Sequence, residues 1–390
     1  MSSTHAREGG RLLQVGQSQE AVKSFQKGLA IDPDDVECLI GLVRTYLSVG
    51  AAREAETAAL RLLSVKPDHA EGQAHLAMLR AQAGNAEALE ALKVLAAAPT
   101  SGYFERFNLG GLLLDRGDLN GARAAYESAL QVAPDSAHVH FELGRIHLQQ
   151  GILGAAVTHF QKAAERAPQE AMPLLMLARA HSAEGALGLA IQAGTQALEK
   201  AQGSLRRAVL EDLFKLYLSA GSPEGAKRTA LELRQLEPAH VNYVYMHGLA
   251  VMSAGSFAEA KALFEEALRM APGSWQTLTA LAQMHGALGE REEARRRLEE
   301  AVALVPTELG PVNDLAMHLM QDDEHSRAKP LLERALAAHP ADATTNLNMA
   351  VATFMTDRAA SLHHAERART LGQGEIRDQA ERILKALGAA

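Results

Sequence analysis

A glycine recurs about every 34 residues along most of this chain. The glycines in register are Gly16, Gly50, Gly84, Gly117, Gly151, Gly185, Gly221, Gly255 and Gly289. Aspartates hold the next two places, Asp323 and Asp357. Glycine adopts a left-handed backbone without steric cost, and aspartate tolerates it better than most residues. The column therefore predicts a tight turn that recurs eleven times, each turn ending the first helix of a helical hairpin.

Three further columns keep the phase of the glycines. Seven residues before each turn, and again five residues after it, nine of the eleven residues are Gly or Ala. Small residues at these places let two helices approach closely where they cross. Proline recurs seventeen residues after the turn, where it ends the second helix and opens the next repeat. These prolines are Pro33, Pro67, Pro134, Pro168, Pro238, Pro272, Pro306 and Pro340.

One stretch combines all of these columns. It contains Leu109, Gly110, Leu113, Gly117, Ala122, Tyr126, Ala129 and Pro134. With this pattern the sequence resembles the tetratricopeptide repeat family over essentially its whole length. The resemblance implies an all-α fold, a right-handed superhelical α-solenoid of about eleven helical hairpins. Small irregularities are expected where the third hairpin ends early at Pro99 and where the sixth has Gln202, Gly203 and Ser204 in place of proline.

The two ends of the chain differ from the middle. Residues 1–373 are predicted to form one continuous solenoid whose first helix is weak, because Gly9 and Gly10 lie inside it. Residues 374–390 are predicted to form a C-terminal capping helix, apolar on one face and charged on the other. The apolar face comprises Ile376, Ala380, Ile383, Leu384 and Leu387.

Composition and charge argue against several classes of protein. Cys38 is the only cysteine, which excludes intramolecular disulfides and cysteine-based zinc or iron–sulfur sites. The net charge of −8 gives no basic footprint for nucleic acid, so no nucleic-acid partner is expected. The polar N-terminus and the absence of a run of ~20 apolar residues predict no signal peptide and no membrane insertion. We therefore expect a cytoplasmic protein, or a periplasmic one if a signal peptide is missing from this sequence.

Motifs of catalysis are absent, so we expect a protein that is not an enzyme and has no cofactor. There is no phosphate-binding loop, no His-Glu-x-x-His helix and no Gly-x-Ser-x-Gly elbow. Among the sixteen histidines, His147, His181 and His285 each lie four residues before a turn glycine, and His140 shares a helical face with His147. We interpret these as partly buried histidines with hydrogen-bond partners and predict no metal site. The pair His363 and His364 is expected at the surface.

The arginines at 295–297 could be taken for a basic patch. Helical spacing instead pairs each of them with a glutamate four residues away, so the charges should cancel on an outer helix. The expected pairs are Glu292–Arg296, Glu293–Arg297, Arg295–Glu299 and Arg296–Glu300.

In the tetratricopeptide repeat family the first helix of each hairpin lines a concave surface on which peptides lie. Carried over column by column, this implies a groove of aromatic and apolar side chains beside a ladder of cations, suited to a peptide with apolar anchors and a carboxylate. The implied peptide-binding residues are Phe104, Phe107, His138, Phe141, Arg145, Met172, Leu175, Arg179, Lys215, Asn242 and Tyr245. The alternative is that Phe104 and Phe141 fill space between neighbouring repeats, and that Glu142 and Glu211 neutralise the cations.

Three functions are consistent with this sequence. The leading hypothesis is a non-catalytic scaffold that binds a partner's peptide or helix in its concave groove. A cell-envelope assembly factor for polysaccharide, pilus or secretion is the second, and the regulatory module of an enzyme on another chain is the third. Self-association through the groove or the first hairpin remains open.

Overall fold

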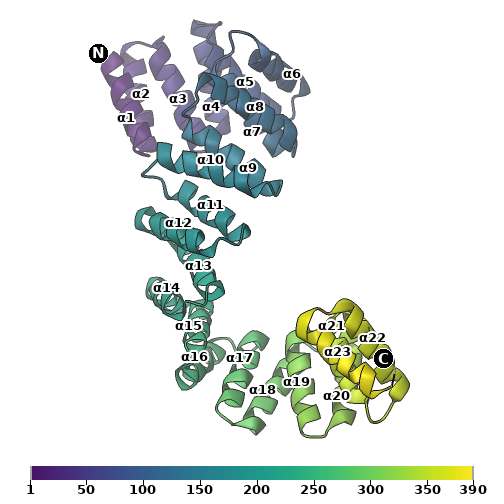
Figure 1. Cartoon of the computed structure of the whole chain (residues 1–390). Coiled ribbons are helices and arrows are strands. Elements are labelled where there is room, and N and C mark those ends of the chain that lie inside the picture. Colours follow the sequence, from purple (N-terminus) through teal and green to yellow (C-terminus); the bar gives the residue numbers. More distant parts are fainter. Residues whose placement is uncertain (1, 389–390) are drawn as a thin grey trace. The chain divides into compact units, whose positions relative to one another are not determined.

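The computed structural model describes residues 2–388, which form α-helices and turns without a strand. The helices are α1 (Ser2–Gln14), α2 (Ser18–Ile31), α3 (Val36–Ser48), α4 (Ala52–Val65), α5 (Ala70–Gln82), α6 (Ala86–Ala97), α7 (Tyr103–Asp115), α8 (Leu119–Val132), α9 (Ala137–Gln149), α10 (Leu153–Arg166), α11 (Ala171–Ala183), α12 (Leu187–Lys200), α13 (Gly203–Ser219), α14 (Pro223–Leu236), α15 (Val241–Ser253), α16 (Phe257–Met270), α17 (Trp275–Ala287), α18 (Arg291–Leu304), α19 (Leu309–Gln321), α20 (His325–Ala338), α21 (Ala343–Thr353), α22 (Arg358–Leu371) and α23 (Gly374–Ala386). Consecutive helices pair into hairpins, as Figure 1 shows. The expected all-α solenoid of helical hairpins is confirmed.

The chain divides into two compact units, Met1–Ala201 and Gln202–Ala390. The first, unit 1, holds the hairpins from α1 to α12, and the second, unit 2, holds those from α13 to α22 together with α23. The division falls where the sequence departs from the repeat at Gln202 and Gly203. There α13 runs for 17 residues, whereas α11 and α15 each have 13.

The predicted turns are present at all nine glycines in register, each of which has a positive φ. At Gly117, for example, the turn is closed by hydrogen bonds from Gly117 N to Leu114 O and from Asp118 N to Leu113 O, both 2.9 Å long. These bonds satisfy carbonyls at the end of α7. Asp323 takes the same conformation, with φ 61°.

Asp357 does not, and the prediction of a left-handed turn residue there is wrong. Its φ is −148°, and its side chain accepts a hydrogen bond from Ala360 N as the N-cap of α22. Helix α21 ends early at Thr353, so the turn lies before Asp357. A carboxylate that caps the following helix requires an extended backbone, which excludes the left-handed conformation.

Glycines seven residues before the turn make room for an aromatic ring from the second helix. A Cβ at Gly110 would lie 2.8 Å from Cδ1 of Tyr126, and one at Gly144 would lie 2.7 Å from Cδ1 of Phe160. The same relationship joins Gly9 to Phe25, at 2.6 Å from Cε1. Helix α1 extends over Ser2–Gln14 despite its two glycines. Gly9 makes room in it for the Phe25 ring.

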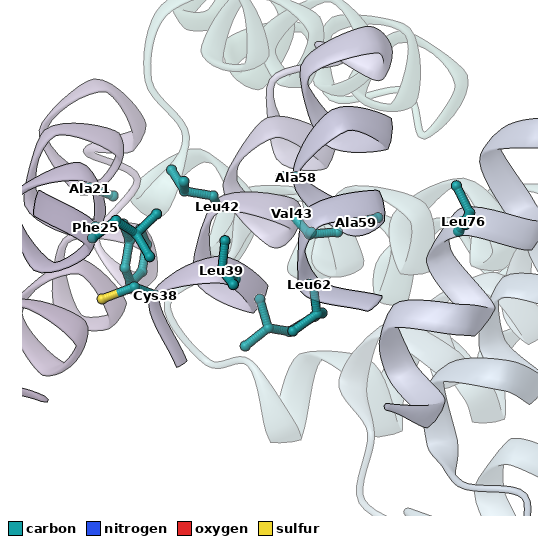
Figure 2. Close-up of a cluster of buried hydrophobic side chains, with 12 residues drawn as sticks. Ala21, Phe25, Cys38, Leu39, Leu42, Val43, Ala58, Ala59, Leu62 and Leu76 are labelled. Atoms are coloured by element: carbon teal, nitrogen blue, oxygen red, sulfur yellow. The ribbon is translucent and has the colours of Figure 1, made fainter. Parts of the chain in front are cut away.

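The core of each unit is a chain of small apolar clusters between neighbouring hairpins. Figure 2 shows the cluster near the N-terminus, in which Phe25 and Cys38 lie beside Leu39 and Leu62. At the other end, Ala380 and Leu384 of α23 are buried against α21 and α22, as predicted for a capping helix. No helix among residues 2–388 has the length and apolarity needed to span a lipid bilayer.

Candidate functional site

The implied groove residues of unit 1 lie on α7, α9 and α11, the first helices of three successive hairpins. On α7 the rings of Tyr103 and Phe107 stack with centroids 5.3 Å apart, and Phe104 meets Tyr103 edge-on at 5.3 Å. Phe107 also packs edge-on against the buried Tyr126 at 5.5 Å. These rings are half-buried, so each is partly fixed in the core and partly open to a ligand.

Phe141 on α9 repeats this arrangement one hairpin further along. Its ring lies 5.8 Å from that of the fully buried Phe160. Phe104 instead bridges two hairpins, because its ring lies 5.6 Å from that of His75 on α5. The alternative that these rings fill space thus holds in part, and what remains for binding is the exposed portion of each ring.

Leu175 does not line the groove, and its assignment is wrong. Only 2% of its surface is exposed. The aliphatic residues of its column, Ile40, Leu175 and Leu347, are all buried, whereas the longer aromatic rings at the same repeat position reach further out. Met172, one turn earlier on α11, is 41% exposed, and His138 on α9 is exposed as well.

The cations of unit 1 have neighbours that limit what they can bind. Arg145 is exposed, and its Nη1 lies 2.8 Å from Oε2 of Glu142. Burial raises the pKa of Glu142 despite the nearby Arg145. The contact between Glu142 and Arg145 that the alternative expected is present. Arg179 is exposed on α11, with Nη1 3.9 Å from Sδ of Met176.

A polar network on α3, α5 and α7, largely buried except at Arg44, was not predicted. Glu71 accepts hydrogen bonds from Nε and Nη2 of Arg44, at 2.6 and 2.7 Å, and lies 3.3 Å from Nε2 of His75. Asn108 Nδ2 is 3.0 Å from Nδ1 of the same imidazole. Arg44 also lies over the Phe104 ring. The sequence held one signal of this network, since His75 and Asn108 occupy the same repeat position in neighbouring hairpins.

The network fixes the charge of its carboxylate. Burial by itself would raise the pKa of Glu71, but hydrogen bonds from His75 and Arg44 outweigh burial and lower the pKa to about 2. Since the carboxylate accepts from Nε2 of His75, that nitrogen carries the proton, and Nδ1 is free to accept from Asn108. Arg44 is thereby held in one orientation at the surface of unit 1.

In unit 2 the implied residues are Lys215 on α13 with Asn242 and Tyr245 on α15. Lys215 and Asn242 are exposed, and Tyr245 is half-buried with its ring 5.5 Å from that of Phe264. Glu211 accepts a hydrogen bond of 2.8 Å from the Tyr243 hydroxyl, which gives this carboxylate a partner other than Lys215. The three predicted residues thus lie on two neighbouring first helices, with Lys215 and Asn242 open to solvent and Tyr245 packed against Phe264.

The histidines mostly have the partners that were expected. His140 and His285 are buried with hydrogen bonds to Pro134 O and to Glu290, and His181 lies 3.4 Å from Glu184. His147 is buried, but its Nδ1 has no partner among the described residues. The prediction for His364 is wrong, because it is half-buried and its Nδ1 lies 2.9 Å from Oδ1 of Asn346. Residues 2–388 contain no group of three or more His, Cys, Asp or Glu side chains placed to hold a metal ion.

The arginine-rich helix α18 has ion pairs in a pattern slightly different from that expected. Two pairs are confirmed, Glu293–Arg297 at 3.0 Å and Arg295–Glu299 at 3.3 Å. Arg296 pairs with Glu293, and Glu300 with Arg297, both at three-residue spacing. Arg295 also reaches Glu324 on the next hairpin at 2.5 Å. The helix therefore presents balanced charge.

A cleft of about 530 Å³ in unit 1 lies between α10, α11 and α12 and contains no residue of the implied groove. Its lining is mixed, with Leu174, Leu177 and Leu189 beside Gln192 and Lys200. The half-exposed rings and ordered arginines on α3, α7 and α9 therefore form a separate surface.

The sequence and the fold were compared with those of known proteins. Two family models described as tetratricopeptide repeats match the chain, one over residues 107–171 and 211–275 and the other over residues 12–83 and 251–313. The chain belongs to the tetratricopeptide repeat family. A solved structure of yeast Tom70 is similar over 99% of this chain and 95% of its own, with a TM-score of 0.51 and 15% identity.

Two further relatives add to the comparison. Human IFIT1, solved as a dimer with m7Gppp-AAAA, is similar over 78% of this chain and 72% of its own, with a TM-score of 0.51 and 20% identity. The outer dynein arm-docking complex subunit 4 of Danio rerio is 40% identical over 53 residues, which is 14% of this chain. The match spans only 11% of that protein. At these identities the solved structures show the tetratricopeptide fold alone.

Proposed function

We propose that this chain is a non-catalytic scaffold that binds a protein partner on the first-helix face of unit 1. The observation that supports this most is that paired arginines share this face with half-exposed rings: Arg44 lies over Phe104, and Arg145 follows Phe141 by one turn of α9. Rings and arginines held in one orientation lose little conformational entropy on binding. Such groups dominate the energy of protein interfaces.

The charges on this face favour a particular ligand chemistry. Arg44 and Arg145 each have a glutamate partner already, so the face carries little net charge. Arg44 donates hydrogen bonds from Nε and Nη2 to Glu71. Its Nη1 can therefore donate to a backbone or side-chain oxygen of a ligand. The ligand that fits is a peptide or helix with apolar anchors for the rings and a few hydrogen-bond acceptors, and a strongly acidic tail fits less well.

The experiment that tests the proposal is capture of partners by the full chain, followed by mass spectrometry and calorimetric titration of the partner found. The test variant is Phe107→Leu with Phe141→Leu and Met172→Ala, which keeps apolar contact with Tyr126 and Phe160 but removes the exposed ring edges. Phe257→Ala is the control, because Phe257 is exposed on α16, a second helix of unit 2.

We expect the triple variant to bind the partner at least tenfold more weakly, with helicity unchanged, and the control to bind as wild type does. Equal affinity of the triple variant and wild type would overturn the assignment of this face.

We extend the same proposal to the cytoplasm as the place of action and to proteins, not nucleic acids, as partners. The single cysteine and the net charge of −8 support both parts. Cell fractionation and a binding assay with a single-stranded RNA oligonucleotide test them.

A further inference from the structure

Three histidine rings meet inside the hairpin of α9 and α10 in unit 1. His140 and His147 come from α9 and His159 from α10, and we call these residues the imidazole cluster. The His159 ring lies 5.3 Å from each of the other two, tilted toward His140 and stacked on His147. His140 is 5% exposed and His147 is 8% exposed, while His159 is half-buried.

The hydrogen bonds of the cluster define where its protons are. His140 Nε2 lies 3.1 Å from the carbonyl oxygen of Pro134, which can only accept, so Nε2 carries a proton. His140 Nδ1 and His159 Nδ1 are 3.0 Å apart and share a single proton. In the neutral pair this proton belongs to His159 and points at the lone pair of His140.

Added protons have no good place in this arrangement. One extra proton can be held, on Nε2 of His159 or, if His159 changes tautomer, on Nδ1 of His140, but it puts a charge into a site that is partly closed to water. A second would set two N–H donors face to face across 3.0 Å, with no acceptor between them. Nδ1 of His147 is buried and has no partner among the described residues, so a proton there would also go unpaired.

The surrounding charges oppose protonation further. Burial lowers the pKa of all three imidazoles, and nearby cations add to the effect, most strongly for His159, whose pKa falls to about 4. The charged groups that face the cluster are Lys162 and Arg166 of α10, Arg123 and Glu127 of α8, and Asp135 in the loop before α9. The two carboxylates favour the protonated forms but are outweighed.

We propose that the imidazole cluster makes the α9–α10 hairpin an acid-sensitive element, which opens as the pH falls below about 6.5 while neighbouring hairpins stay closed. In the opened hairpin each imidazole regains its ordinary affinity for protons. The stability that neutral imidazoles contribute is therefore complete above pH 6.5 and is lost as the pH falls toward the lowered pKa values. Each proton taken up raises the opening equilibrium by up to about tenfold per pH unit.

Amide hydrogen exchange of the full chain at pH 7, 6 and 5 tests this, after correction for the chemical exchange rate at each pH. The reference is the α3–α4 hairpin of the same unit, which contains no histidine. We expect protection of α9 and α10 amides to fall at least tenfold between pH 7 and pH 5, with α3 and α4 changing much less. An equal change in both hairpins would overturn the proposal.

A variant identifies the responsible group. In His159→Asn the side-chain amide can still donate to His140 Nδ1, but it does not titrate, so the acid-induced loss of protection should shrink. His339→Asn is the control, because His339 is exposed in unit 2. If His159→Asn keeps the full pH dependence, the cluster is not the cause. If that variant does not fold, the comparison of the two hairpins in the wild type decides alone.

The α9 helix also carries Phe141 and Arg145, so opening would disturb the binding face if the proposed function holds. Hydrogen exchange needs no ligand, and its outcome is therefore independent of whether a partner binds there.

Discussion

Arg44 on α3 lies over the ring of Phe104 on α7, with 5.3 Å between the guanidinium carbon and the ring centroid. Glu71 on the intervening first helix, α5, accepts two hydrogen bonds from the same guanidinium. Three successive hairpins of unit 1 are thus joined through one cation. Such a contact orders the arginine before any partner arrives, which reduces the entropy lost on binding.

The pH dependence of stability should reveal the Glu71 carboxylate. Its pKa is lowered from 4.5 to about 2, so its contribution is complete above pH 4.5 and is lost as the pH falls toward 2. This loss amounts to about 3 kcal/mol at most. In Glu71→Gln, urea unfolding should show a flatter pH profile in this window than wild type. Glu54→Gln, at an exposed site on α4, should keep the wild-type profile.

Adjacent glycines on α1 should respond in opposite directions to the same substitution. Gly9→Ala forces a Cβ into the Phe25 ring, which should cost about 1–3 kcal/mol. Gly10 has no atom within 4 Å of an added Cβ, so Gly10→Ala should stabilise the helix by up to about 1 kcal/mol. Thermal unfolding followed by circular dichroism measures both. A destabilised Gly10→Ala would contradict the packing described for α1.

Asp323 and Asp357 hold the same repeat position but should also differ. Asp323 has a left-handed backbone, so Asp323→Gly should raise stability by about 0.5–1 kcal/mol. Asp357 has an extended backbone and caps α22, so Asp357→Gly gains nothing and loses the cap, at a cost of a few tenths of a kcal/mol, roughly. Midpoints of urea unfolding compare the two, and a gain at Asp357 would show that its turn is described wrongly.

Leu175 and Met172 lie one turn apart on α11, but Leu175 belongs to the core and Met172 to the surface, so their substitutions should have different effects. Leu175→Ala should lower the free energy of unfolding by about 2–5 kcal/mol, because it leaves a cavity. Met172→Ala should change stability by less than about 0.5 kcal/mol and weaken partner binding instead. Denaturant unfolding of each variant, with titration of a captured partner, checks both. Similar losses of stability would refute the placement of these two side chains.

The fold could be read from the sequence because its strongest signals are local. The left-handed backbone of Gly117 and the space for a ring at Gly110 both depend only on the hairpin that contains these residues. Leu175 and Asp357 were misplaced because their environments depend on side-chain length and on where the next helix begins. These features do not follow from the repeat register.

The candidate site was predictable only in part. Phe107 and Phe141 lie on the first helices α7 and α9, as the repeat register predicts, but the contacts of their rings with Tyr126 and Phe160 depend on how the two helices of each hairpin pack. Arg44 and Glu71 come from separate hairpins, and no spacing in the sequence predicts the two hydrogen bonds between them. Contacts across repeats require the stacking of one hairpin on the next.

The fit of a ring into a missing Cβ, as at Gly110 and Tyr126 or at Gly248 and Phe264, lies wholly within one hairpin. Four hairpins, those with Gly9, Gly110, Gly144 and Gly248, carry this fit, and the Phe25 ring of the first also meets Gly41 of the next hairpin. Gain or loss of one whole repeat elsewhere in the array leaves the fit at Gly110, Gly144 and Gly248 intact, whereas an insertion between one of these glycines and its ring breaks it. Arrays of this kind can therefore change length in whole steps during evolution.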